Sequence, residues 1–170
     1  MTTTLERVGL DYFDRAEFCF VSTQEVNADP DRIFDVFLDA ESWTKWVPVI
    51  KRVEWTSPFP IGVGSTRTVT MTSGFQGHEE FIAFERGERM SFRFNETSRP
   101  ALDAFAEDYL VTDLGNGRSR IVWKMAMDPQ RRARPSLKVF SPAIRFGLAT
   151  TLRKFSRYVE SNPVLSSDNP

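Results

Sequence analysis

The sequence has little of what a metalloenzyme, a disulfide-stabilised protein or a membrane protein needs. It contains one cysteine, Cys19, and one histidine, His78. One cysteine excludes an internal disulfide, and one of each residue cannot form a Cys/His zinc site, so we expect no metal. No stretch approaches the roughly 20 apolar residues of a membrane-spanning helix, and the N-terminus lacks the apolar run of a signal peptide. We therefore expect a cytoplasmic protein.

Charge and motif content exclude further classes of function. The formal net charge is −1, so the chain as a whole has no electrostatic field that would attract nucleic acid, and we predict no such partner. The sequence lacks a Walker-type phosphate loop and a Gly-x-Ser-x-Gly nucleophile motif. Gly62 and Gly64 lie between two strand-like segments without a following helix, which does not fit a dinucleotide site. We expect no cofactor.

Phenylalanine, in contrast, is abundant, and the apolar pattern predicts one α+β domain over residues 1–170 with an ordered core of about 15–161. The 15 phenylalanines supply large, rigid groups for a core or a cavity wall. Residues 17–26 mix aromatic, β-branched and polar side chains as a half-buried strand does. Pro30 can begin a helix after Asp29, and a second short helix over 42–46 should end before Pro48.

From residue 49 to residue 128 the pattern has period two, which predicts a meander of antiparallel strands. The predicted strands are 49–56, 65–72, 78–85, 90–96, 103–113 and 119–127. Asn116 and Gly117 tolerate the positive φ of a tight hairpin turn between the last two. Beyond Pro129 the apolar residues recur at helical spacing, and Ser141 with Pro142 predicts the start of a long helix, preceded by a separate turn over 137–140.

This order of elements, together with several short segments, resembles the START-like or SRPBCC helix-grip superfamily, and within it the polyketide cyclase/dehydrase-like branch. The segments are 26–34, 43–48, 64–67, 117–123 and 148–158. The resemblance implies a curved antiparallel sheet of about seven strands wrapped around a long C-terminal helix. It also implies a hydrophobic pocket between sheet and helix for a lipid, a steroid or a polyketide-like molecule. Members of the superfamily include binders, transfer modules and cyclases, so the fold alone does not name the activity.

Alternation along the strands predicts which residues face such a pocket, because side chains i and i+2 share one face of a sheet. The more apolar face should be the inner one, and the alternative for each residue is ordinary core packing. The predicted lining consists of Arg67, Val69, Met71, Ile82, Phe84, Met90, Phe92, Phe94, Phe105, Tyr109, Trp123, Met125, Leu148, Leu152 and Phe155.

Two strands leave the position of the polar groups open. In 78–85 either His78 and Glu80 or the alternate set faces inward, and an inward histidine would be a proton carrier near neutral pH. In 103–113 we favour the aromatic set, which brings Glu107 and Tyr109 inward. These four are the candidate catalytic residues, if there is catalysis. An ion pair between Arg67 and Glu107 would be either a polar anchor in the pocket or an exposed pair at its rim.

The C-terminal region is basic, with no acidic residue between Asp128 and Glu160. It can form a weak contact with a membrane surface or an acidic partner, or it can be the solvated back of a helix. The residues concerned are Arg131, Arg132, Arg134, Arg153, Lys154 and Arg157. Three hypotheses follow: a binder of a hydrophobic small molecule, a cyclase or dehydrase using the same cavity, and a membrane-surface or protein-partner module. The sequence does not identify the ligand or the oligomeric state.

Overall fold

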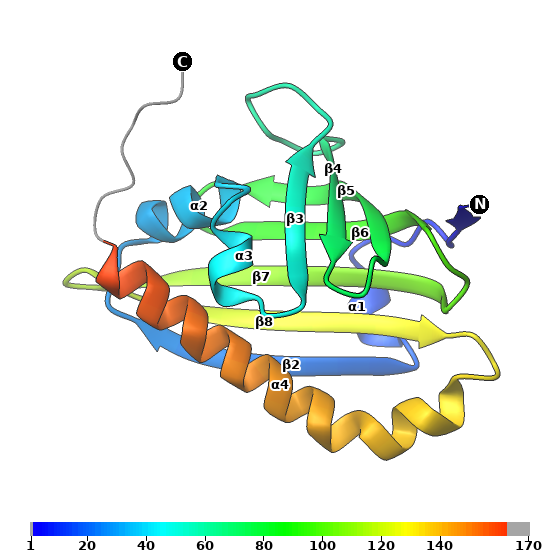
Figure 1. The fold of residues 1–170 in the computed structure, drawn as a ribbon. Helices are drawn as coiled ribbons and strands as arrows, with labels where there is room; N and C mark the ends of the chain where they lie inside the picture. The colour runs from blue at the N-terminus through cyan, green and yellow to red at the C-terminus, as the bar shows by residue number, and fades with distance from the viewer. Residues whose placement is uncertain (1, 163–170) are drawn as a thin grey trace.

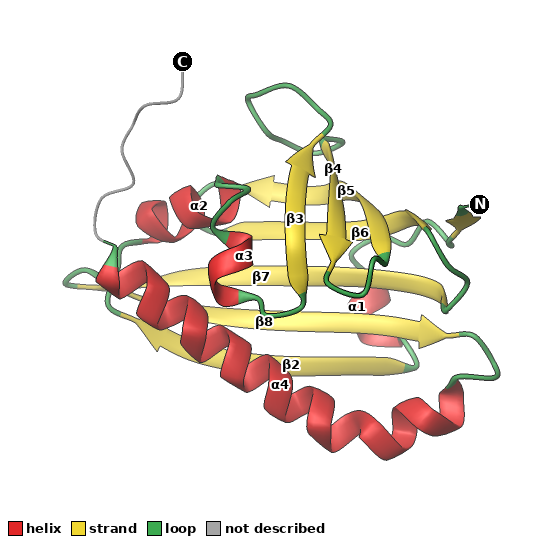
Figure 2. Ribbon diagram, viewed as in Figure 1, coloured by secondary structure: helices red, strands yellow, loops and turns green. Residues whose placement is uncertain are grey.

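The computed structural model describes residues 2–162, and it has the predicted helix-grip architecture: a curved antiparallel sheet with a long C-terminal helix across its concave face (Figures 1 and 2). The strands follow the order β2-β8-β7-β6-β5-β4-β3. Their bounds are β2 Phe18–Val26, β3 Ile50–Trp55, β4 Thr66–Met71, β5 Gln76–Glu85, β6 Arg89–Thr97, β7 Leu102–Gly115 and β8 Arg118–Pro129. The chain therefore begins the sheet at one edge with β2 and then runs as a meander back toward it.

The N-terminal segment carries two elements that the sequence did not predict. The two-residue strand β1 (Thr3–Thr4) pairs with β6, and helix α1 (Tyr12–Arg15) lies on the convex face of the sheet. The outward side chains of β7 and β8 under α1 are alanines, with Ala106 paired opposite Ala126. Small side chains leave room for Tyr12, which is fully buried there. The convex face thus has a small core of its own.

Two short helices, α2 (Pro30–Leu38) and α3 (Trp43–Trp46), cover part of the concave face. Ile33, Phe34 and Phe37 of α2 are fully buried, as their helical spacing predicts, and Leu38 is partly buried. Two hydrogen bonds fix α3 against α2: Ser42 Oγ donates to Val36 O at 2.6 Å, and Trp43 Nε1 donates to Phe37 O at 2.9 Å. Trp43 is therefore held in one orientation beside the sheet.

The long helix α4 spans Arg134–Ser161, so the predicted start at Ser141 and the separate turn before it are wrong. Pro142 lies inside the helix rather than in its first turn. Proline removes one backbone hydrogen bond, which bends a helix without ending it when the flanking turns are intact. Ser141 Oγ donates to Leu137 O at 2.8 Å in this region, and Figure 1 shows the helix changing direction in its first half.

The two halves of α4 differ in how firmly they pack. In the second half Leu148, Leu152 and Phe155 are buried, and the Phe155 ring lies 5.0 Å from Phe37 and 4.9 Å from Trp46 between centroids. The first half has no buried side chain; its inward residues are only partly buried. The space left under this half is the cavity described below. No helix within residues 2–162 is both long and apolar enough to cross a bilayer.

Candidate functional site

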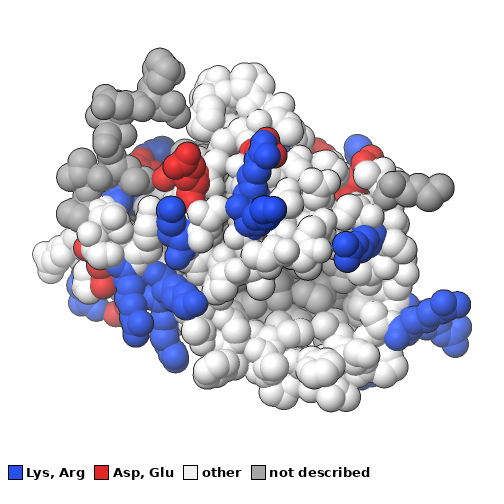
Figure 3. All heavy atoms as spheres, in the orientation of Figure 1, with Lys and Arg blue, Asp and Glu red and all other residues white. Residues whose placement is uncertain are grey.

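A cavity of about 430 Å³ lies between the concave face of the sheet and α4. Its walls come from α3, the start of β3, strands β4 to β8 and one side of α4. They consist of Trp43, Val47, Val49, Ile50, Arg67, Val69, Met71, Glu79, Phe92, Phe94, Phe105, Glu107, Tyr109, Trp123, Met125, Met127, Ile144, Gly147, Leu148 and Thr151. Figure 3 shows the surface hollowed above the first half of α4. The lining is almost wholly apolar, apart from a small group of polar side chains.

Strand β7 places its aromatic set on the concave face, the arrangement that the sequence favoured. Phe105, Glu107 and Tyr109 line the cavity, and Glu107 pairs across the strands with Met125. The opposite face of β7 carries Asp108, which is fully buried and forms a two-pronged ion pair with Arg89 at 2.8 and 2.9 Å. The alternation of β7 therefore separates one carboxylate for the cavity from one for the convex side.

Strand β5 answers the other open question, because its histidine faces away from the cavity. Glu79 and Phe81 point inward, whereas His78 and Glu80 lie on the convex face. His78 Nδ1 is 3.0 Å from Thr68 Oγ1, and Glu80 accepts a hydrogen bond from Asn95 at 2.6 Å. Because neither group reaches the cavity, neither can act on a molecule bound there.

A register shift between Phe81 and Ala83 changes the alternation further along β5. After it, Phe84 packs against the core, with its ring 5.8 Å from Phe34 and 6.2 Å from Phe81. Ile82 stays on the outer face of the strand between them, only partly buried. Neither Ile82 nor Phe84 lines the cavity.

The predicted Arg67–Glu107 ion pair is wrong, because Arg67 pairs with Glu79. The two residues are opposite each other on β4 and β5, and Arg67 Nε donates to Glu79 Oε2 with both side chains at most 4% exposed. The Arg67 guanidinium also stacks on aromatic rings, 4.3 Å from the centroid of Trp43 and 4.7 Å from that of Phe92. A buried guanidinium needs such partners because it always carries its charge.

Glu107 has neutral donors as its direct partners instead of a cation. Tyr109 Oη donates to Glu107 Oε2 at 2.7 Å, and Trp123 Nε1 donates to the same oxygen at 3.1 Å. Burial raises the pKa of Glu107 to about 7, an effect that the Tyr109 hydrogen bond opposes and the nearby Glu79 charge increases. Near neutral pH this carboxyl is therefore present in both its protonated and its ionised form.

The other polar groups of the cavity are perturbed in the same direction. Burial raises the pKa of Glu79, although the Arg67 charge opposes the rise. Burial, and then the charge of Glu107, raise the pKa of Tyr109 well above its usual value, so the phenol stays a hydrogen-bond donor. Arg67 Nη1 is buried without a hydrogen-bond partner within residues 2–162. The cavity thus combines one unused N–H donor with a carboxyl that can take up or release a proton.

Residues 17–160 match the family described as "Polyketide cyclase / dehydrase and lipid transport". The chain belongs to this family. An uncharacterised protein of Mycobacterium tuberculosis is 44% identical over 156 residues, which is 92% of this chain and 93% of the relative.

Solved structures support the same fold. The Zhui aromatase/cyclase of a Streptomyces species has a TM-score of 0.71 at 11% identity and covers 88% of this chain and 98% of its own. A START superfamily protein of Mycobacterium smegmatis has a TM-score of 0.62 at 15% identity, covering 84% and 94%. At these identities the likeness concerns the fold alone.

For this family member, most of the side chains predicted from the sequence do line the cavity. Those that do not are either core residues or lie on the outer face of β5. Met90, Leu152, Phe155 and Phe84 pack in or against the core, whereas His78, Glu80 and Ile82 face outward. The parity of β8 also predicts Met127 inward, and it lines the cavity. Sequence reasoning missed other lining residues, which come from the α3–β3 segment, β5 and α4. These are Trp43, Val47, Val49, Ile50, Glu79, Ile144, Gly147 and Thr151.

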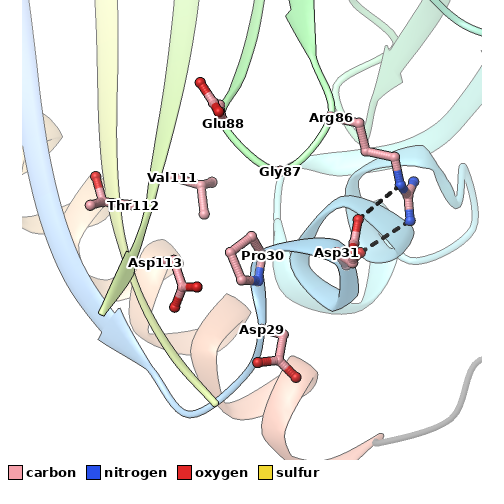
Figure 4. A pocket seen from close by; sticks show the side chains of 9 residues that line it. All are labelled: Asp29, Pro30, Asp31, Arg86, Gly87, Glu88, Val111, Thr112 and Asp113. Carbon is pink, nitrogen blue, oxygen red and sulfur yellow. Dashed lines mark hydrogen bonds and ion pairs between the residues drawn. The ribbon is translucent and has the colours of Figure 1, made fainter. Parts of the chain in front are cut away.

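A second, larger groove of about 770 Å³ lies near the N-terminus of α2, between the β5–β6 turn and β7 (Figure 4). Its charged side chains are exposed, and some of them form ion pairs. Arg86, for example, donates to Asp31 at 3.2 Å and to Asp35 at 2.6 Å. Within residues 2–162 no group of carboxylates has an arrangement that could hold a metal ion. This groove lacks the enclosed apolar wall of the cavity under α4 and contains none of the predicted site residues.

Proposed function

We propose that the protein binds a hydrophobic small molecule in the cavity between the sheet and α4. The observation that carries this proposal is the cavity itself, an apolar space of about 430 Å³. Pockets for small molecules span about 300–1,000 Å³ and combine apolar walls with a few polar groups that fix the orientation of the ligand. A filled core would have no such space, since protein interiors are close-packed.

The polar groups favour a ligand that carries an oxygen acceptor. Arg67 is one of the residues that line the cavity, and its Nη1 is buried without a hydrogen-bond partner within residues 2–162. An unpaired buried N–H is costly until an oxygen accepts from it, so a ligand oxygen that reaches Nη1 would be favoured. The Arg67–Glu79 pair and the flanking rings fix the guanidinium before any ligand arrives. A carbonyl, phenol or carboxylate at one end of an otherwise apolar molecule meets these requirements.

Gly147 provides a direct test, because it lines the cavity and a Cβ at this position would meet no atom within 4 Å. Gly147→Trp adds a large side chain at the mouth, and Gly147→Ala is the matched control. With 1-anilinonaphthalene-8-sulfonate as the probe, we expect wild type and Gly147→Ala to bind with equal affinity. We expect Gly147→Trp to bind at least about tenfold more weakly, a loss of about 1.4 kcal/mol. Equal binding by all three proteins would contradict the proposal.

Native mass spectrometry supplies a second measurement that does not depend on a dye. The purified protein should retain an apolar small molecule of cellular origin, and Gly147→Trp should retain less of it than Gly147→Ala. A crystal structure of the purified protein in which side chains fill this space would also refute the binding function.

A second candidate function is proton transfer on the bound molecule, as in a cyclase or dehydrase. The observation that favours it is Glu107, whose pKa of about 7 suits a general acid or base at neutral pH. As a carboxylate it would take a proton from the carbon next to a carbonyl, while Arg67 Nη1 donates a hydrogen bond to the enolate oxygen. Returning the proton to carbon or to a leaving hydroxyl would restore the carboxylate.

Exchange of the acidic C–H of 1-phenyl-1,3-butanedione in D₂O, followed by NMR, tests the proton transfer. Wild type should accelerate the exchange, and Glu107→Gln should reduce the acceleration by about 100-fold or more. Glu80→Gln makes the same chemical change on the convex face of β5 and should leave the rate unaltered. If exchange is no faster than in buffer while dye binding is intact, the proton-transfer function is refuted and the binding function stands.

A further inference from the structure

The first half of α4 exposes an apolar strip that the proposed ligand site does not use. We define the strip as Val139, Phe140, Ala143 and Phe146. Val139 is 73% exposed, Phe140 61% and Phe146 71%. Residues 139, 143 and 146 have the spacing i, i+4, i+7 and therefore share one helix face. Large apolar side chains that are scattered singly on a surface are normal, but a row of them on one helix face marks an interaction site.

Val139, Ala143 and Phe146 lie on a face of α4 turned away from the cavity lining, whereas Phe140 has the spacing i, i+4, i+7 with the lining residues Ile144 and Gly147 and lies one turn before them. Leu137 and Ile144 of the same half pack toward the core, and Ile144 and Gly147 line the cavity. Val49, which is 53% exposed, lines the cavity from the α3–β3 segment. Ile144 and Gly147 directly follow Ala143 and Phe146 in the helix, so the mouth of the cavity borders the exposed strip.

Cations flank the strip at both ends, and no acidic residue lies between 129 and 159. Arg131 and Arg132 precede it, and Arg153, Lys154 and Arg157 follow it, all exposed. Within residues 2–162 none of these five side chains forms an ion pair, so their charges are available to a partner. Figure 3 shows this distribution: uncharged surface over the first half of α4, with basic side chains toward both of its ends.

We propose that this face of α4 docks on the surface of a membrane that contains anionic lipids. Apolar and aromatic side chains on one face of a helix, with Lys and Arg beside them, are what an interfacial helix needs to enter the boundary between headgroups and acyl chains. Each Lys or Arg near an anionic surface adds about a fivefold gain in binding. A second copy of this chain is a poorer occupant, because a symmetric contact through the strip would bring like charges together.

Docking in this way would bring the mouth of the cavity close to the bilayer. The strip enters the lipid boundary while Ile144 and Gly147, on the adjoining faces of the same helix, stay at the mouth. An apolar molecule could then pass between lipid and cavity with little exposure to water. The docking itself does not depend on which ligand the cavity takes, so it can be tested with the ligand unidentified.

Flotation with phosphatidylcholine vesicles, with and without phosphatidylglycerol, tests the docking at low salt. Wild type should bind the anionic vesicles, bind neutral vesicles much more weakly, and lose binding as salt is raised. Arg153→Gln/Lys154→Gln should lower binding by about 30-fold, and Phe140→Gln/Phe146→Gln should lower it by at least about tenfold. The control Val21→Gln/Val63→Gln changes two other exposed valines, 50% and 70% exposed, and should bind as wild type does.

Four results would overturn the proposal. The first two are that wild type does not bind anionic vesicles, or that the control variant loses as much binding as the strip variant. The other two are that neither the strip variant nor the charge variant changes vesicle binding, or that light scattering shows a dimer of wild type which Phe140→Gln/Phe146→Gln dissociates. Thermal unfolding of each variant shows that it is folded, which the high exposure of the substituted side chains predicts. Dye binding in the cavity should survive in the strip variants, so a failure of docking and a failure of ligand binding are distinguishable.

Discussion

Replacing Glu107 by Gln should make the protein more stable, and increasingly so as the pH rises. The pKa of Glu107 rises from its ordinary value of 4.5 to about 7 in the folded protein. The folded state therefore holds this proton more tightly than the unfolded state does. Wild-type stability is greatest below about pH 4.5 with respect to this group and falls as the pH rises through 7, since the buried carboxylate must then be charged.

The size of the effect follows from the two pKa values. A shift from 4.5 to about 7 corresponds to a cost of about 3 kcal/mol once the group is fully ionised, of which about 1 kcal/mol is present at pH 5 and nearly all at pH 8. A glutamine side-chain oxygen can accept the hydrogen bonds from Tyr109 and Trp123 that Glu107 accepts. The stability of the variant relative to wild type should therefore increase by about 2 kcal/mol between pH 5 and pH 8.

Urea unfolding of both proteins at pH 5, 6, 7 and 8 measures this difference. Glu80→Gln is the matched control on the convex face, where the hydrogen bond from Asn95 lowers the carboxyl pKa. A lowered pKa gives stability that is present at neutral pH and lost on acidification, so this control should be less stable than wild type at pH 8. A stability difference between Glu107→Gln and wild type that stays constant with pH would refute the assigned burial of a neutral carboxyl.

Three further substitutions test the packing around the site. Arg67→Met leaves Glu79 buried without its cation and should lower the free energy of unfolding in urea by about 3–5 kcal/mol. Adding Glu79→Gln should restore most of this stability, and equal stability of the single and double variants would contradict the ion pair. Gly77→Ala places a Cβ 2.7 Å from Phe94 Cζ, so it should lower the free energy of unfolding by about 1–3 kcal/mol. It should also weaken dye binding, because Phe94 lines the cavity and must move. Unaltered dye binding would contradict the assignment of Phe94 to the cavity wall. Phe155→Ala removes a fully buried ring and should cost about 3–5 kcal/mol, and a loss under 1 kcal/mol would mean that α4 is not anchored there.

The sequence predicted elements whose pattern is purely local. Alternation in 90–96 and 119–127 identified β6 and β8 with their inner faces, because each strand has one clearly more apolar side. The spacing of the apolar residues identified α2 for the same reason. Pro142 was misleading because proline is common in the first turn of a helix but can also lie inside one. In α4 the turns on both sides of Pro142 are intact, so the helix continues past it with a bend.

The orientation of polar side chains was harder to predict from the sequence, since a carboxylate on either face of a strand is compatible with the local pattern. In β5 both faces carry one, and only the pairing with β4 showed that Glu79, not Glu80, meets Arg67. One signal was available: Glu79 shares its face with Phe81, a residue expected to seek the core. Arg67 itself was placed correctly by parity, but its partner depends on the strand register, which no periodicity specifies.

The family, the curved sheet and the apolar faces of strands with one clearly apolar side, such as β6 and β8, follow from the sequence alone, because hydrophobic period and turn residues act over a few neighbouring positions. The tertiary structure decided what the cavity can do. A cavity lies under the loosely packed half of α4, and His78 lies on the outer face of the sheet. Glu107 is buried beside neutral hydrogen-bond donors, so its pKa approaches 7. These properties depend on distances and burial between distant segments, which the order of residues does not record.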